Sequence, residues 1–232
     1  MPNLSVVYFT ANVISDYFAK NTQKQLLKAI GDLPLISVSK KPMDFGQNIC
    51  VGDTPRSHFN IYRQALIGAK AAGTKYIALA EDDVLYSSEH FNYRSSPGKF
   101  AYNLDVWSIF TWSDPPMFSH KGTVRRCLHA LICERDLFIE AMEERFTKHP
   151  DDSKTKKDVW GEPGKYERQL GVTVRETEDF YANPPNIVFS HETALAYEGL
   201  GTRKRIGEYR AIEIPYWGRA EDIVKLYKEK DE

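Results

Sequence analysis

The sequence predicts an α/β fold in which helices flank a mostly parallel central sheet within a single domain. Three strand-like apolar segments alternate with two helix-like segments in the first third of the chain, an order typical of parallel strands joined by right-handed crossovers. The chain has 232 residues, enough to bury a substantial core, and no internal repeat or linker divides it.

The first third supplies two strands and a helix before its central strand. Residues 4–9 and 34–38 are expected to be strands, and the segment from Ser15 to Gly31 a helix, because its apolar residues recur at helical spacing. A second helix is expected to begin with Thr54 as N-cap and Pro55 at its first position, and to run to Ala72. The apolar face of the first helix consists of Phe18, Leu26, Leu27 and Ile30.

Residues 39–53 lack periodicity and are predicted to be a loop over the site, whereas residues 76–80 are apolar on both faces, as a covered central strand should be. Further along, each remaining element is expected from its local pattern. These are strands at 102–110, 127–133, 172–175 and 186–190, helices at 136–146, 165–170 and from about 220, a polar loop at 149–157 and a basic segment at 199–210.

Composition excludes several classes of protein. The formal net charge is −1, so the overall charge indicates no particular partner. Three cysteines (Cys50, Cys127 and Cys133) form no disulfide framework, and the strand-like spacing of Cys127 and Cys133 places both toward the core. We expect a cytoplasmic protein without a membrane span, because no long apolar run occurs. The phosphate-binding loop, the dinucleotide glycine fingerprint and the Gly-x-Ser-x-Gly elbow are all absent from the sequence.

Three adjacent carboxylates, Glu81, Asp82 and Asp83, follow the central strand. Ligands in open parallel sheets bind beyond the carboxyl ends of the strands. Carboxylates held together there repel one another unless a cation compensates, and oxygen ligands suit Mg²⁺ or Mn²⁺. The simpler interpretation is that acidic residues end a strand in solvent, and alternation along an extended chain lets only some of the three reach one ion.

The segment Tyr76-Ile77-Ala78-Leu79-Ala80-Glu81-Asp82-Asp83-Val84, preceded by an alanine-rich helix, resembles the core of the GT-A glycosyltransferases, especially the family that includes cellulose and chitin synthases. That family ends this strand in an Asp-x-Asp motif that holds Mn²⁺ or Mg²⁺ against a sugar-nucleotide diphosphate. The resemblance implies a GT-A-like fold, with Asp83 and Glu81 as metal ligands, Asp82 beside the donor, and His191, after a late strand, completing the metal site.

Four other residues are candidates for donor binding. Arg56 is expected in the first turn of its helix, where a cation is unfavourable unless an anion such as a diphosphate is near; a solvated surface arginine is the alternative. Thr10 and Asn12 follow the first strand, where similar enzymes place the nucleoside, although small polar residues also simply form turns. Arg203, in a basic stretch, is expected to close over the leaving group.

The catalytic base is expected among two carboxylates, Glu162 and Glu167, in the segment 160–167. Inverting members of the family carry a Glu-Asp doublet at this stage of the chain. This segment departs from the doublet, so a retaining mechanism stays open. Either carboxylate could deprotonate an acceptor hydroxyl within hydrogen-bond reach.

The sequence therefore predicts a metal-dependent hexosyl- or pentosyltransferase that moves sugar from a nucleotide-sugar donor to an acceptor hydroxyl. Residues 1–85 would form the donor half, 86–198 the acceptor half and 199–232 a basic closing segment and terminal helix. We expect a monomer or small homo-oligomer. One acceptor consistent with the basic residues is a hydroxymethylated base in phage DNA, which would place the enzyme in the host cytoplasm. The alternatives are a nucleotidyltransferase, a metal-dependent phosphohydrolase, and a non-catalytic nucleic-acid-binding module.

Overall fold

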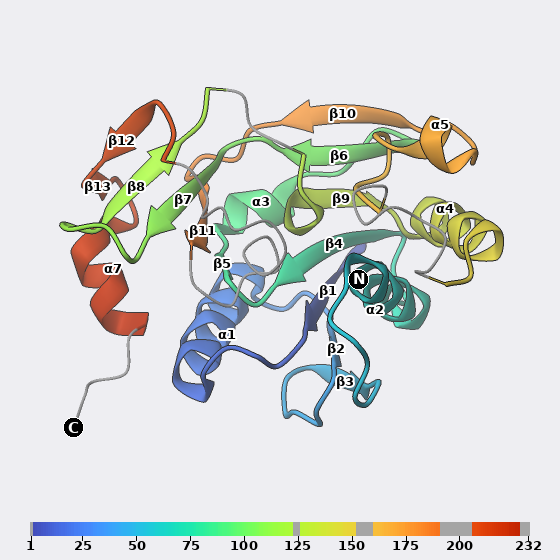
Figure 1. Cartoon of the computed structure of the whole chain (residues 1–232), viewed down its shortest axis with the longest axis horizontal. Coiled ribbons are helices and arrows are strands. Elements are labelled where there is room, and N and C mark those ends of the chain that lie inside the picture. Colours follow the sequence, from blue (N-terminus) through green and yellow to red (C-terminus); the bar gives the residue numbers. More distant parts are fainter. Residues whose placement is uncertain (1, 123–125, 152–159, 191–205, 228–232) are drawn as a thin grey trace.

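Seven strands form the central sheet of the computed structural model, which describes residues 2–122, 126–151, 160–190 and 206–227. These strands are β1 (Leu4–Thr10), β2 (Leu35–Ser39), β3 (Gln47–Cys50), β4 (Tyr76–Glu81), β6 (Lys99–Asn103), β9 (Leu131–Glu134) and β10 (Glu176–Phe180). Their order is β10-β6-β9-β4-β1-β2-β3, and every neighbouring pair is parallel except those that β9 makes with β4 and β6 (Figure 1). The predicted α/β fold with a mostly parallel central sheet is confirmed.

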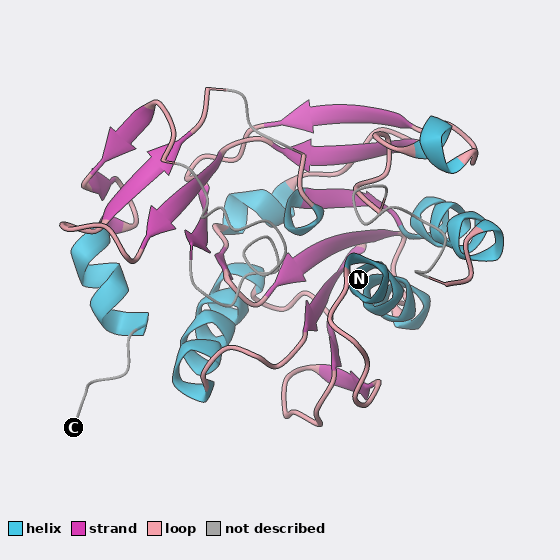
Figure 2. Ribbon diagram, viewed as in Figure 1, coloured by secondary structure: helices cyan, strands magenta, loops and turns pink. Residues whose placement is uncertain are grey.

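A second, five-stranded sheet follows the order β12-β8-β7-β11-β5 and lies beside the first (Figure 2). Its strands are β5 (Val84–Leu85), β7 (Val106–Phe110), β8 (Met117–His120), β11 (Asn186–Ser190) and β12 (Tyr209–Ala211); β13 (Glu213–Ile214) and β14 (Gly218–Arg219) form a short hairpin. β11 runs antiparallel to β5, so its end lies beside the acidic turn between β4 and β5.

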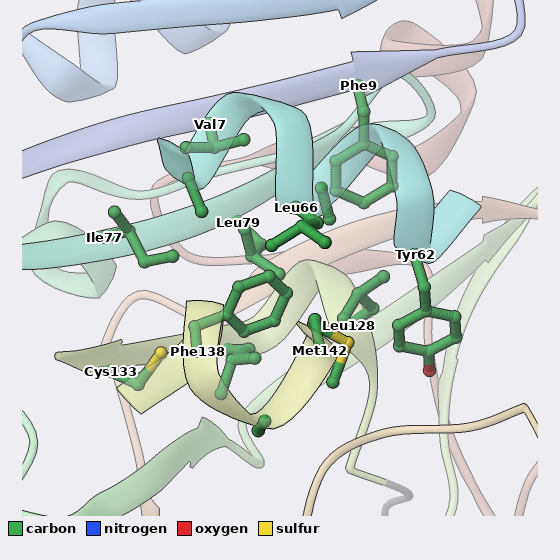
Figure 3. Close-up of a cluster of buried hydrophobic side chains, with 14 of the residues drawn as sticks. Val7, Phe9, Tyr62, Leu66, Ile77, Leu79, Leu128, Cys133, Phe138 and Met142 are labelled. Carbon is green, nitrogen blue, oxygen red and sulfur yellow. The ribbon is translucent and has the colours of Figure 1, made fainter. Parts of the chain in front are cut away.

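Helices cover both faces of the central sheet. They are α1 (Asp16–Ile30), α2 (His58–Ala71), α3 (Ser88–Asn92), α4 (Arg135–Lys148), α5 (Glu167–Leu170) and α7 (Ala220–Tyr227), with a 3₁₀ turn, η1, at Leu128–Ala130. One face packs against α2 and α4 around Val7, Leu79 and Phe138 (Figure 3). The other packs against α1 and α3 around Leu4, Leu26 and Phe91. Within the described residues, no helix is long and apolar enough to cross a membrane.

The chain departs from the expected elements at several places. β3 lies inside the predicted loop 39–53, and the predicted strand 102–110 is divided between β6 and β7, because Asn103 Oδ1 accepts a hydrogen bond from Asp105 N and turns the chain. The predicted strand at 172–175 is wrong, since β10 begins at Glu176. The first part of 127–133 is η1, which leaves Cys127 only half-buried, whereas Cys133 is buried as expected.

The beginning of α2 also differs from the expectation. Ser57, and not Thr54, is its N-cap: the Ser57 backbone is extended and its Oγ accepts a hydrogen bond from Asn60 N at 3.2 Å. Arg56 consequently precedes the helix and does not lie in its first turn. On α1, Leu27 was expected to face the core, but it is 48% exposed.

The strand order reverses between β1 and β4: β2 and β3 continue on one side of β1, while β4 lies on its other side. At such a switch point the connections leave in opposite directions, and open α/β sheets bind their ligands beyond the carboxyl ends of the two strands there. Thr10 ends β1 and Glu81 ends β4, so the acidic turn lies at the carboxyl ends of the two strands that flank the switch point.

Candidate functional site

The site begins with a hydrogen bond across the switch point. Thr10 Oγ1, at the end of β1, donates to Asp82 Oδ2 at 2.5 Å, and the same hydroxyl oxygen accepts from Asn12 N at 2.9 Å. Thr10 is buried, whereas Asp82 and Asp83 are partly exposed in the turn before β5. One hydroxyl thus fixes an acidic side chain that follows β4.

Neutral tyrosine side chains lie beneath the acidic turn. Burial, together with the carboxylates of Asp82 and Asp83, raises the pKa of Tyr8 far above its ordinary value. The Tyr86 hydroxyl accepts from Glu81 N at 3.0 Å and donates to His129 O at 3.2 Å, and burial raises its pKa well above the usual range. These phenols stay protonated and supply donors, not additional negative charge.

A second set of hydrogen bonds joins the ends of β1 and β2. Asn12, at φ 52°, accepts from Lys40 N at 2.8 Å and Lys41 N at 3.0 Å through Oδ1. The buried Gln64 side chain of α2 donates to Thr10 O at 3.0 Å. Thr10 and Asn12 therefore organise the loops at the carboxyl edge of the sheet, where the sequence placed them.

Glu162 is presented by a segment fixed on both sides. The Tyr102 hydroxyl donates to Pro163 O at 2.7 Å, and Arg145 Nη1 donates to Gly161 O at 2.6 Å. A Cβ on Gly161 would lie 2.1 Å from the Tyr166 ring, and one on Gly164, at φ +87°, would lie 2.0 Å from Thr177 Cγ2. Both glycines are therefore required for the segment to take this path.

The Glu162 side chain is 19% exposed, and Lys165 Nζ lies 3.9 Å from its carboxylate. Burial raises the pKa of Tyr62 well above its ordinary value, and the carboxylates of Glu162 and, more weakly, Glu81 raise it further. Tyr62 lies on α2 with its ring 6.1 Å from that of Trp160, and its hydroxyl points away from the apolar cluster in Figure 3. Tyr62 is therefore affected by the charges of both Glu162 and Glu81.

Glu167, the other candidate base, has a different environment. Its side chain is 4% exposed and Oε1 accepts from Arg145 Nη2 at 2.7 Å and from Gly164 N at 2.5 Å. Arg145 is buried as well, so the two charges compensate each other inside the protein. This geometry favours Glu162 over Glu167 for contact with a substrate.

The remaining predicted site residues are not all described. Arg56 is partly buried just before α2, and His191 and Arg203 lie outside the described residues. β11 nevertheless ends beside the acidic turn, with Phe189 N donating to Asp83 O at 2.9 Å. Most of the basic segment 199–210 also lies outside the described residues, and its end forms β12.

The carboxylates of the acidic turn meet the needs of a hard divalent ion only in part. Among the described residues, no three Asp, Glu, His or Cys side chains come together in a way that could hold a metal. Asp82 and Asp83 are adjacent in the turn before β5, and both carboxylates raise the pKa of Tyr8. Mg²⁺ and Mn²⁺ commonly use one or two carboxylates and fill their other positions with water and phosphate oxygens. The pair therefore suits a metal that arrives with, or also binds, a diphosphate.

Lys40 and Tyr62 were not among the site residues expected from the sequence. Lys40 follows β2 directly, is 14% exposed at its side chain and pairs with Asp53 at 3.2 Å. Its place after a predicted parallel strand was a usable signal, because the carboxyl ends of such strands share one edge. Tyr62 carried no comparable signal, since a tyrosine at helical spacing within an apolar face is typical of a core residue.

Comparisons with known proteins give only distant similarities. No family model and no curated protein matches the chain. A glycosyltransferase involved in glycosylation of the major capsid of PBCV-1 superposes with a TM-score of 0.46 at 12% identity, over 85% of this chain and 97% of that one. The bifunctional IspDF from Campylobacter jejuni gives a TM-score of 0.42 at 10% identity, over 83% of this chain and about half, 53%, of that one. Such values assign no family, so the function has to be inferred from the site itself.

Proposed function

We propose that the protein is a glycosyltransferase that uses a nucleotide-sugar donor and an acceptor hydroxyl. The observation that carries the proposal is the Thr10–Asp82 hydrogen bond across the switch point between β1 and β4. It places an ordered acidic turn where an open α/β sheet binds its ligand. The sequence around this turn is also the part that resembles the GT-A core.

Each part of the site has a chemical task in this proposal. Asp82 and Asp83 would hold Mg²⁺ or Mn²⁺, which supplies positive charge for the departing diphosphate. Thr10 fixes Asp82, and Asn12 orders the loop that carries Lys40. Glu162 accepts the proton of the acceptor hydroxyl, because it is a partly exposed carboxylate on a fixed backbone. Arg56, His191 and Arg203 remain candidates for the donor side.

Incubation with a panel of nucleotide sugars, with Mn²⁺ or with chelator, tests the reaction class. We expect release of nucleoside diphosphate in the presence of metal. Release of pyrophosphate would instead indicate nucleotidyl transfer, and release of phosphate or monophosphate a phosphohydrolase. The acceptor panel should include simple sugars and hydroxymethylated duplex DNA, because both present hydroxyl groups to a carboxylate base.

Asp83→Asn tests the proposed role of Asp83 as a metal ligand. It removes a carboxylate charge but keeps the side-chain shape, so turnover should be lost by a factor of about a hundred or more while the fold persists. Asp32→Asn is the control, because Asp32 is an exposed aspartate just after α1. Metal-stimulated activity that is unchanged in Asp83→Asn would refute a ligand role for Asp83.

A further inference from the structure

The segment Gly161-Glu162-Pro163-Gly164 has its backbone hydrogen-bonded at three of its four residues. Gly161 O accepts from Arg145 Nη1 at 2.6 Å, Pro163 O accepts from the Tyr102 hydroxyl at 2.7 Å, and Gly164 N donates to Glu167 Oε1 at 2.5 Å. Glu162 is the residue of the segment whose side chain is a partly exposed carboxylate. Ordering such a segment costs conformational entropy, and these three hydrogen bonds offset part of that cost.

Arg145 and Glu167 supply two of these three hydrogen bonds and also bind each other at 2.7 Å. Arg145 reaches the segment from α4, and Glu167 from the first residue of α5. The guanidinium thus uses one nitrogen for the backbone before Glu162 and another for the carboxylate that holds the backbone after it. A planar fork with several donors is suited to this double task, and an ammonium group is not.

A buried ion pair is weak evidence for stability by itself. The desolvation of two charges offsets much of their attraction, and apolar residues of similar volume often serve equally well. Stability alone therefore does not explain why both charges are retained here. The other consequence of the pair is the position of Glu162.

We propose that Arg145 is a positioning residue that acts, together with Glu167, by fixing the backbone on both sides of Glu162. This inference rests on the proposed function only where Glu162 is taken as the base. Loosening the segment should let the carboxylate depart from hydrogen-bond reach of the acceptor hydroxyl, which slows turnover without weakening the donor.

The test uses a double substitution, because removing one member of the buried pair leaves an uncompensated charge that endangers folding. Arg145→Met with Glu167→Met removes both charges and every side-chain hydrogen bond that the two residues make to the segment, and keeps the approximate volumes. We expect kcat to fall about tenfold to a hundredfold with the donor KM unchanged. Arg145→Lys should retain part of the activity, because it keeps the charge but loses the fork.

A double-mutant cycle with Glu162→Gln separates positioning from general damage. If Arg145 and Glu167 act through Glu162, adding their substitutions to Glu162→Gln should change kcat by no more than about twofold. Losses that simply multiply would overturn the proposal. Arg94→Met is the matched control: Arg94 is half-buried and donates to Phe91 O at 2.7 Å and Tyr93 O at 2.6 Å, away from this segment.

Hydrogen exchange at the Gly164 amide gives a measurement that needs no activity. The Gly164 amide loses its acceptor in the Arg145→Met/Glu167→Met protein, so its exchange should become faster there. Exchange in Arg94→Met should equal that of the unaltered protein. Unchanged protection of Gly164 would refute the positioning role. If the Gly164 amide exchanges faster in the double variant but the unaltered protein transfers no sugar, the proposed function is refuted. The role of Arg145 and Glu167 in fixing the segment then stands.

Discussion

At the scale of single residues, Glu162 and Glu167 are only five positions apart in the sequence but lie in different environments. Glu162 keeps part of its carboxylate in solvent, whereas Glu167 is enclosed with Arg145. The sequence could not distinguish them, because the partner of Glu167 lies 22 residues earlier on α4. A carboxylate that already receives two hydrogen bonds is less available to take a proton from a substrate.

Thr10 gives the most direct prediction at this scale. Thr10→Val keeps the shape of the side chain but removes the hydroxyl that donates to Asp82. The Asp82 carboxylate should then lose its fixed orientation. Turnover with a nucleotide sugar should fall roughly tenfold to a hundredfold, since a hydrogen bond to a charged group contributes about 1.5–3 kcal/mol.

Thr10→Ser is the matched variant, because it retains the hydroxyl and removes only a methyl group. Steady-state kinetics at saturating metal should show Thr10→Ser close to the unaltered protein and Thr10→Val clearly slower. Equal rates for the two variants would mean that the hydrogen bond to Asp82 has no catalytic consequence. Thermal unfolding of both proteins checks that any difference is not a loss of fold.

At the scale of elements, the sequence predicted the covered strands and missed the edges. β1 and β4 were found because side chains on both of their faces are buried, which leaves a nearly unbroken apolar run. β3 and β10 lie at the two edges of the sheet and carry mainly polar residues, so their pattern does not differ from that of a loop. The α2 boundary was missed because Thr54 and Ser57 are both acceptable N-caps.

The packing of α2 on β1 supports a prediction about Gly68. A Cβ at this position would lie 2.3 Å from Val7 Cγ1, so Gly68→Ala must displace the helix or the strand. We expect a loss of about 1–3 kcal/mol in the free energy of unfolding, measured by urea titration. Because α2 also carries Gln64 and Tyr62, the same shift should reduce turnover.

Gly73→Ala is the control, since a Cβ there meets nothing within 4 Å. Val7→Ala combined with Gly68→Ala should recover part of the lost stability, because it removes the methyl group that the new Cβ would meet. An additive loss in the double variant would show that overpacking against Val7 is not the cause.

At the scale of the whole molecule, the proposed site draws on segments far apart in the chain. Thr10, the acidic turn and Glu162 come from β1, the end of β4 and the segment before α5. The sequence indicated the first two, because parallel strands meet at one edge. It could not indicate that the chain after β6 leaves for a second sheet, since that turn depends on Asn103 and on contacts formed only in the folded state.

The joint between the two sheets contains a buried histidine, from which a pH dependence follows. His90 on α3 lies with Nδ1 3.3 Å from Asn103 Nδ2, and its ring is stacked 5.8 Å from Phe180. Burial, with a smaller contribution from His129, lowers the pKa of His90 to about 3. The histidine is therefore neutral in the folded protein over the whole physiological range.

The sign of the effect follows from proton binding. Above about pH 6.5 His90 is neutral in both the folded and the unfolded chain, so it contributes no pH dependence. Between pH 6.5 and about 3 the unfolded chain binds a proton that the folded protein does not, and stability falls as the pH falls. At pH 4.5 this single group should destabilise the fold by roughly 2–3 kcal/mol relative to pH 7.5.

His90→Asn isolates this contribution from that of the carboxylates, because asparagine can accept the hydrogen bond from Asn103 but does not titrate. The variant should be less stable than the unaltered protein at pH 7.5, where it loses packing against Phe180. Its deficit, measured by urea unfolding, should shrink by roughly 2–3 kcal/mol at pH 4.5, since only the unaltered protein binds the additional proton on unfolding. A deficit that stays constant between the two pH values would mean that His90 is protonated in the folded protein, and that the joint between the sheets admits a charge that its apolar surroundings should exclude.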